Sequence, residues 1–194
     1  MIMRPILYLV IGVALTGMAP EELQMVRPST MMVVSENDPF AQADKATVSL
    51  GTFRTDWFRE FTPKLSAYRP RNGGEPVYQF EIELRPLRSP GTIRSVVALG
   101  GEPLREVDVE AFNFNCSRNC YNSAAGIWAL TENQMTTLRS GAHLPVRVET
   151  TNGPEHYLTI DIPPAALAAL LGWESKNRGS VIPSLDSLGL PPDP

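Results

Sequence analysis

The stretch Tyr78-Gln79-Phe80-Glu81-Ile82-Glu83-Leu84 alternates apolar and polar side chains without interruption. Successive side chains of a β-strand point to opposite faces of the sheet. A period of two therefore predicts a strand with one buried and one solvated face. This stretch is the clearest strand pattern in the chain, and it indicates a mainly β protein.

Further strand patterns follow toward the C-terminus. Residues 93–99 form an apolar run between the turn formers Pro90-Gly91 and Gly100-Gly101. Residues 107–116 alternate as well, but their apolar phase shifts by one residue after Ala111, as a β-bulge would produce. A hairpin is predicted across a connection that contains Asn152-Gly153. Its predicted apolar partners are Leu144, Val146 and Val148 with Leu158, Ile160 and Ile162.

Two short helices are predicted within this β framework. Thr131 and Gln134 have the spacing of a capping box at the start of one helix, and Gly141 provides its end. The second helix is predicted over 165–171, with Pro164 in the first turn and Gly172 as the stop. A third helical turn is indicated by aromatic residues spaced four apart, which we assign to the core. These residues are Phe53, Trp57 and Phe61.

These patterns predict a single antiparallel β-sandwich domain over residues 47–173, with two or three short helices. Residues 20–46 lack a sustained period and are expected to form an extended arm or tether. Residues 174–194 return to Ser, Gly and Pro, and are expected to be a flexible or partner-docked tail.

The first 19 residues are typical of an export signal. Arg4 precedes an uncharged, apolar run that ends with Gly17-Met18-Ala19, where small residues suit cleavage after Ala19. Pro20 would hinder that cleavage, so a retained anchor formed by residues 5–19 is the alternative. Both readings place the body outside the cytoplasm, because the basic flank stays inside. We expect a periplasmic or extracytoplasmic protein, with membrane contact only through this segment if it is uncleaved.

Composition limits the classes of partner. The formal net charge is −4, and Lys and Arg do not cluster along any face. This balance argues against nucleic acid and against an anionic membrane surface as the main partner. The chain also contains no nucleophile elbow, zinc-protease helix motif, phosphate loop or dinucleotide-binding glycine motif, so we expect no enzymatic activity.

Cys116 and Cys120 are the only cysteines of the chain. They flank Ser117-Arg118-Asn119, which would form a three-residue loop between strand ends. Opposed strand residues lie close enough for a disulfide, and an exported protein meets oxidising conditions. We therefore predict a Cys116–Cys120 disulfide that fixes the shape of the loop.

Copper handling or thiol redox chemistry is the alternative use of this pair. Thiolate and thioether ligands select Cu(I), and two thiolates with His residues resemble the ligand loops of exported copper-handling proteins. The candidate metal ligands are Cys116, Cys120, His143 and His156. The histidines lie far beyond the cysteine loop in sequence, so our primary expectation is that the protein has no cofactor.

The order of these features resembles a known family. From Phe112 to Leu171 the chain runs through Cys-x-x-x-Cys, a short apolar strand, a capped helix ending at Gly141, a hairpin and an Ala/Leu-rich helix. With the preceding export signal, this layout resembles the exported invasion-associated locus B family of α-proteobacteria. The resemblance implies a compact periplasmic β-sandwich with a role in the cell envelope. It transfers no catalytic residues to this chain.

Apolar clusters in the two predicted arms suggest where a partner binds. A purely solvated linker has no reason to keep such clusters, so we expect them to order on a partner. The candidate residues are Met31, Met32, Val33, Val34, Val181, Ile182, Leu185 and Leu188. The sequence therefore predicts a binding or accessory subunit of a larger membrane-associated assembly, with other envelope or membrane proteins as partners.

Overall fold

The structure is a computed structural model that describes residues 23–36, 43–56, 58–85, 93–112, 123–150 and 157–177. Its secondary structure is mainly β, which confirms the predicted fold class. The export-signal segment 1–19, Trp57, and the turns at Pro90-Gly91 and Asn152-Gly153 lie outside the described residues. In chain order the elements are β1 (Gln24–Arg27), β2 (Val33–Glu36), β3 (Ala43–Ser49), β4 (Thr52–Arg54), β5 (Lys64–Pro70), β6 (Val77–Leu84), β7 (Ile93–Ala98), β8 (Arg105–Phe112), β9 (Ser123–Ala129), α1 (Glu132–Arg139), β10 (Leu144–Thr150), β11 (Tyr157–Ile162) and α2 (Pro164–Asn177).

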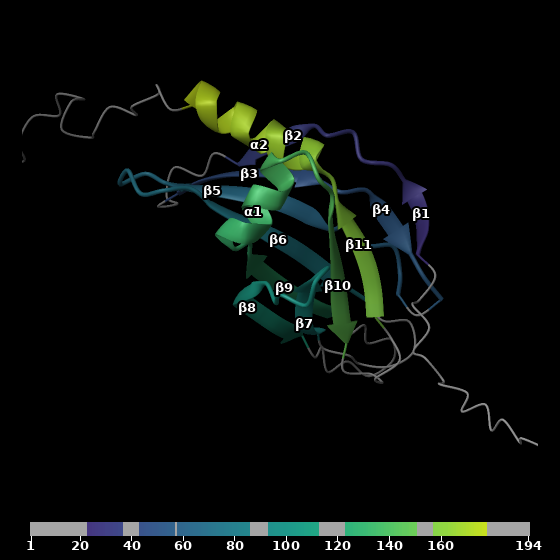
Figure 1. The fold of residues 1–194 in the computed structure, drawn as a ribbon. Coiled ribbons are helices and arrows are strands. Elements are labelled where there is room, and N and C mark those ends of the chain that lie inside the picture. Colours follow the sequence, from purple (N-terminus) through teal and green to yellow (C-terminus); the bar gives the residue numbers. More distant parts are fainter. Residues whose placement is uncertain are drawn as a thin grey trace, which may run out of the picture.

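β6 lies inside a six-stranded antiparallel sheet with the order β2-β3-β5-β6-β9-β8 (Figure 1). The predicted alternation is confirmed on its apolar face, where Tyr78, Phe80, Ile82 and Leu84 are all buried. The ring of Phe80 packs against that of Trp128 from β9, with ring centroids 6.4 Å apart. The polar face is less solvated than predicted, because Gln79 is only 9% exposed.

A three-stranded sheet with the order β11-β10-β7 forms the second layer of the sandwich-like body (Figure 1). The predicted hairpin is confirmed in its register, which pairs Leu144 with Ile162, Val146 with Ile160, and Val148 with Leu158. The buried side chains of both sheets belong to one hydrophobic core. The face of the six-stranded sheet that points away from this core is called the outer face below.

α1 begins as its capping box predicts. The hydroxyl of Thr131 accepts a hydrogen bond from the backbone N–H of Gln134, and the side chain of Gln134 accepts one from the N–H of Thr131. Gly141 follows the helix with a φ of 86°, in the left-handed region that favours glycine. Among the described residues, neither helix is long and apolar enough to cross a membrane.

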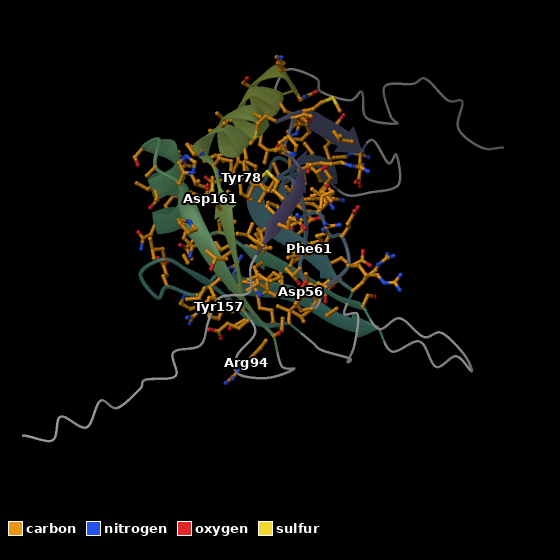
Figure 2. All side chains as sticks on the ribbon, turned by 90° about the vertical axis from the view of Figure 1, so that its right-hand side faces the viewer. Asp56, Phe61, Tyr78, Arg94, Tyr157 and Asp161 are labelled. Atoms are coloured by element: carbon orange, nitrogen blue, oxygen red, sulfur yellow. The ribbon has the colours of Figure 1, made fainter. Side chains whose placement is uncertain are left out.

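α2 is longer than the sequence predicts. It runs through Gly172, the expected stop, and ends at Asn177. Its last turns are held by the body, because the Tyr78 hydroxyl donates a 2.7 Å hydrogen bond to the buried carboxylate of Glu174. Figure 2 shows Tyr78 beneath this helix. The structure thus corrects the boundary at residue 173, since Glu174 belongs to the folded body.

Two local predictions are corrected. Phe53 and Phe61 are buried as expected, but they face each other across a β-bridge and not along a helical turn. Their ring centroids are 6.1 Å apart. The bulge in β8 lies between Glu106 and Asp108, earlier than the predicted position after Ala111.

The segment 20–46 is also corrected as far as it is described. We expected an arm, yet β1 pairs with β4 and β2 forms the edge strand beside β3. β3 itself begins at Ala43, ahead of the predicted start of the body at residue 47. These residues therefore form one margin of the folded body.

Asp44→Asn is expected to lower the free energy of unfolding at neutral pH by about 1–3 kcal/mol. The Asp44 carboxylate accepts hydrogen bonds from Arg69 at 2.5 Å and Arg71 at 2.9 Å. Burial alone raises the pKa of Asp44, but the two guanidinium groups outweigh it and hold the pKa below its ordinary value. This stabilisation is complete above the ordinary pKa and is lost as the pH falls through the lowered folded value.

Urea unfolding at neutral pH and below about pH 3 measures this effect. The difference between wild type and Asp44→Asn should shrink in acid, because the wild-type carboxyl then also becomes neutral. Asp108→Asn is the matched control, since Asp108 is exposed and makes no ion pair with the described residues. A difference that is equal at both pH values would contradict the assignment.

Candidate functional site

The predicted cysteine site lies outside the described residues. Cys116, Cys120 and His156 all fall there, so the disulfide and the copper or redox alternative stay predictions. His143 is described: it is exposed, and its Nδ1 is hydrogen-bonded to the carboxylate of Asp161 on β11. In the part of the chain that the structure describes, no group of three or more His, Cys, Asp or Glu side chains could hold a metal ion.

The predicted partner-binding residues fall into two groups. Val181, Ile182, Leu185 and Leu188 lie outside the described residues. The other four residues lie at and just before β2, where Met31 and Val33 pack against the core of their own domain. Met32 and Val34 point the other way, with 66% and 52% of their surface exposed. The structure thus leaves Met32 and Val34 as the available members of this cluster.

β1, β2 and the kink between them form one margin of the body, residues 24–36, which we call the N-terminal edge. The kink is fixed at Ser29, whose hydroxyl donates to the carbonyl of Ser49 and accepts a 3.1 Å hydrogen bond from the N–H of Met31. Gly51 allows β3 to bend into β4 with a φ of 115°. A Cβ at Gly51 would lie 3.2 Å from the carbonyl oxygen of Arg27, so the close approach of β1 also depends on glycine.

The opposite edge of the six-stranded sheet, β8, is protected against strand pairing. It contains the bulge at Val107 and carries charged side chains at Arg105, Glu106 and Asp108. Bulges and charges on edge strands prevent the addition of a further strand. The N-terminal edge instead exposes Met25, Met32 and Val34. Its one proline, Pro28, lies in the kink outside β1 and β2.

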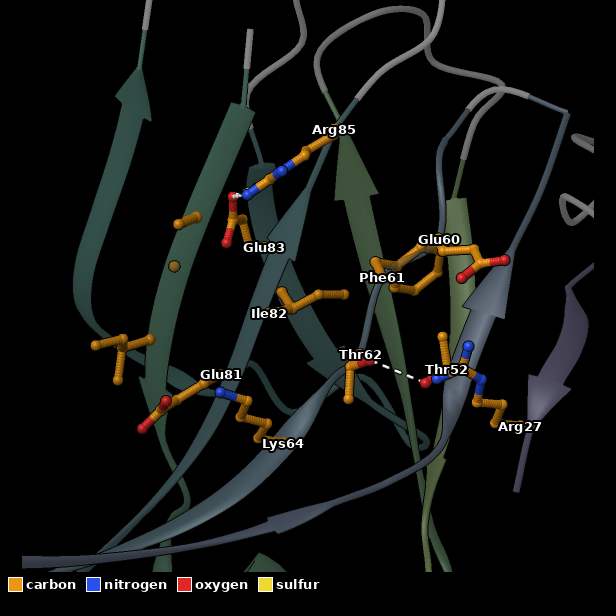
Figure 3. A pocket seen from close by; sticks show the side chains of 13 residues that line it. Arg27, Thr52, Glu60, Phe61, Thr62, Lys64, Glu81, Ile82, Glu83 and Arg85 are labelled. Carbon is orange, nitrogen blue, oxygen red and sulfur yellow. Dashed lines mark hydrogen bonds and ion pairs between the residues drawn. The ribbon is translucent and has the colours of Figure 1, made fainter. Parts of the chain in front are cut away.

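A groove of about 570 Å³ opens on the outer face beside the N-terminal edge (Figure 3). Its lining includes Ala125 and Gly126 of β9, and the small side chain of Ala125, which pairs with Glu83, covers little of the outer face. Its walls carry charges of both signs from four segments of the chain. The charged lining residues are Arg27, Glu60, Lys64, Glu81, Glu83 and Arg85.

Some of these charges are already paired. Arg85 forms an ion pair with Glu83 at 2.9 Å. Lys45, which lies outside the groove on the same outer face, forms one with Glu81 at 3.1 Å. The hydroxyls of Thr52 and Thr62 bond to each other at 3.0 Å, and Figure 3 shows them between Lys64 and Arg27. Within the described residues, the lining residues without an ion pair are Arg27, Glu60 and Lys64. As far as the chain is described, the groove therefore offers two cations and one carboxylate that make no ion pair.

Lys45, Tyr68 and Glu81 form a partly buried polar cluster on the outer face. The Tyr68 hydroxyl donates to Glu81 at 3.4 Å, and the Lys45 ammonium lies 5.1 Å from the centre of the Tyr68 ring. Burial lowers the pKa of Lys45, but the Tyr68 hydroxyl and the Glu81 carboxylate outweigh burial and raise it. For the Tyr68 hydroxyl, burial has the opposite effect and raises the pKa. These raised pKa values keep the Lys45 amine protonated and the Tyr68 phenol neutral at neutral pH.

Ser66 lies two residues before Tyr68 on the same face of the sheet, where it pairs with Thr47 and Gln79. Its side chain is fully buried and its hydroxyl has no hydrogen-bond partner among the described residues. A nucleophile must reach its substrate, and a base must be free to take a proton. A sealed Ser66 and a protonated Lys45 meet neither condition. The arrangement suits binding by fixed charges and strand edges.

Comparison with models of known protein families, with curated proteins and with solved structures gives no match for this chain. The resemblance of residues 112–171 to the invasion-associated locus B family therefore stays a prediction.

Sequence reasoning missed the groove. Outward-facing Glu and Lys residues on strands look like ordinary solvated positions, and nothing in a single strand shows which of them lack a partner. The signal that could have found the groove is Ala125, because a small side chain on the outer face of a strand leaves that part of the sheet thinly covered.

Proposed function

We propose that this protein is an exported, non-catalytic accessory subunit that binds an envelope protein through its N-terminal edge. The observation that carries the proposal is the contrast between the two margins of the six-stranded sheet. β8 has a register shift and a run of charged residues, whereas β2 pairs with β3 in unbroken register and exposes Val34, with exposed Met32 just before it. A regularly paired edge strand with exposed apolar side chains is a site at which an extended segment of a partner can add to a sheet.

Two further observations support a binding role. The outer-face groove adjoins this edge and contains charged groups that make no ion pair with the described residues, which a partner could provide. The N-terminal sequence supports export, because Arg4 and the apolar run after it have the layout of a signal or anchor. An anchored or periplasmic body would meet its partners at or near the membrane.

Val34→Lys is expected to reduce recovery of the partner assembly from gently solubilised membranes at least ten-fold. A charged side chain on an edge strand opposes pairing, and a ten-fold change corresponds to only about 1.4 kcal/mol of binding free energy. Val34 is 52% exposed, so its replacement should leave the melting temperature of the protein nearly unchanged. The measurement is quantitative mass spectrometry of proteins that copurify with the tagged full chain.

Val107→Lys is the matched control. Val107 is 48% exposed and lies on the opposite edge of the same sheet, so the substitution adds the same charge at a similar exposure. The control should retain the assembly. Equal recovery with both variants would exclude the N-terminal edge as the binding surface.

A further inference from the structure

Four exposed side chains of the N-terminal edge project onto the outer face. Val34 pairs with Thr47 and Glu36 with Lys45, and directly paired residues share a face of a sheet. Arg27 belongs to the two-stranded sheet of β1 and β4, where it pairs with Thr52, and both residues line the groove on the outer face. Met32 joins them because its neighbours Met31 and Val33 both pack against the core. The exposed residues on this side of the N-terminal edge are therefore, in chain order, Arg27, Met32, Val34 and Glu36.

The charges at the two ends of this row have no partner in the described part of the chain. Arg27 lines the groove but makes no ion pair there. Glu36 lies opposite Lys45, but the ammonium of Lys45 is bonded to Glu81 at 3.1 Å. The edge thus presents a cation at one end and a carboxylate at the other, neither of them paired with a described residue, and exposed apolar side chains between them.

The direction of an added strand follows from the sheet. Every strand pairing in the described residues is antiparallel, including the pairing of β2 with β3. The kink at Ser29 is held by hydrogen bonds, and Met31 has a φ of 52°, so the edge is not straight between β1 and β2. A partner segment that follows the whole edge must bend at the same place.

We infer that the partner contributes an extended, antiparallel segment with a basic residue opposite Glu36, apolar residues opposite Val34 and Met32, a bend, and then an acidic residue opposite Arg27. The inference rests on the proposed function and names the chemistry of the partner. The acidic side chain lies at the rim of the groove, where the ammonium of Lys64 and the hydroxyls of Thr52 and Thr62 also line the wall. Cross-strand pairs of opposite charge stabilise such a strand, and like charges in these positions oppose it.

Two synthetic peptides test this assignment. One begins with Lys, carries Val at alternate positions, contains a Gly-Ser bend and ends with Asp; the other has the Lys and the Asp exchanged. We expect the first peptide to bind the full chain about ten-fold more tightly by fluorescence anisotropy, since the exchange turns two attractive pairs into two repulsive ones. The preference should weaken as the ionic strength rises.

The double variant Arg27→Glu/Glu36→Lys should invert the preference, so that the second peptide binds more tightly. This inversion cannot arise from a folding defect, because a damaged protein would lose both peptides. Equal binding of the two peptides, or an unchanged preference in the double variant, would overturn the inference. If neither peptide binds while Val34→Lys still loses the partner assembly, the charge pattern is wrong and the proposed function stands.

Sedimentation of the free protein separates a second copy from a different partner. We expect a monomer. A dimer that dissociates in Val34→Lys would show that a second copy occupies the edge, and it would overturn the assignment of a separate partner segment.

Discussion

Phe80→Ala is expected to lower the free energy of unfolding by about 3–5 kcal/mol. Phe80 has no exposed surface, and its ring packs against Trp128 between the two sheets. Removal of the ring loses the free energy gained by transferring it from water into the core. It also leaves a cavity that the two packed sheets can only partly close. Chemical denaturation monitored by the fluorescence of Trp128, together with circular dichroism, measures the change.

Glu83→Ala is the control in the same strand. Glu83 is exposed, and its one ion pair within the described residues is with exposed Arg85; exposed ion pairs contribute about 0–1 kcal/mol. Gln79, on the same face of β6, would be a poor control because it is only 9% exposed. Small and equal effects of Phe80→Ala and Glu83→Ala would show that β6 presents a different face to the core.

Gly126→Ala is expected to lower the free energy of unfolding by about 1–3 kcal/mol or more, although it adds one methyl group. A Cβ at this position would lie 2.1 Å from Cη2, 2.6 Å from Cζ3 and 2.9 Å from Cζ2 of Trp128. Trp128 is 1% exposed, so the ring must shift within a packed core to admit the methyl group. Differential scanning calorimetry should show a lower melting temperature.

Gly172→Ala is the matched control, because the same substitution should have the opposite sign there. Gly172 lies inside α2, and a Cβ at this position meets no atom within 4 Å. Alanine is favoured over glycine in a helix interior by about 0.8–1 kcal/mol. A Gly126→Ala variant at least as stable as wild type would mean that Trp128 does not cover Gly126.

The elements that the sequence predicts correctly are those whose residue pattern follows from a single physical constraint, such as burial of one face or a local hydrogen bond. β6 alternates because one of its faces is buried, and the register of β10 with β11 follows from apolar residues on both strands. α1 begins at Thr131 because its capping hydrogen bonds are local. In each case the physical constraint acts on side chains a few residues apart, so a single sequence contains it.

The elements that it misplaces depend on contacts distant in sequence. Phe53 and Phe61 have helical spacing by coincidence, because the chain reverses and brings them together across a β-bridge. Gly172 does not end α2, since Tyr78 holds Glu174 two residues further along. The groove is lined by β1, β4, β6, β9, the segment before β5 and the first residue of β5, and no local pattern records that combination.

The hydrogen bond from Tyr78 to Glu174 joins residues 96 positions apart. β6 is therefore synthesised long before the helix that completes its cover, and contacts of such separation form late because they close long loops. Until α2 docks, the apolar side chains beside Tyr78 remain exposed and can contact other incompletely folded chains. A product that stops before residue 164 would expose this surface permanently and would be prone to aggregate.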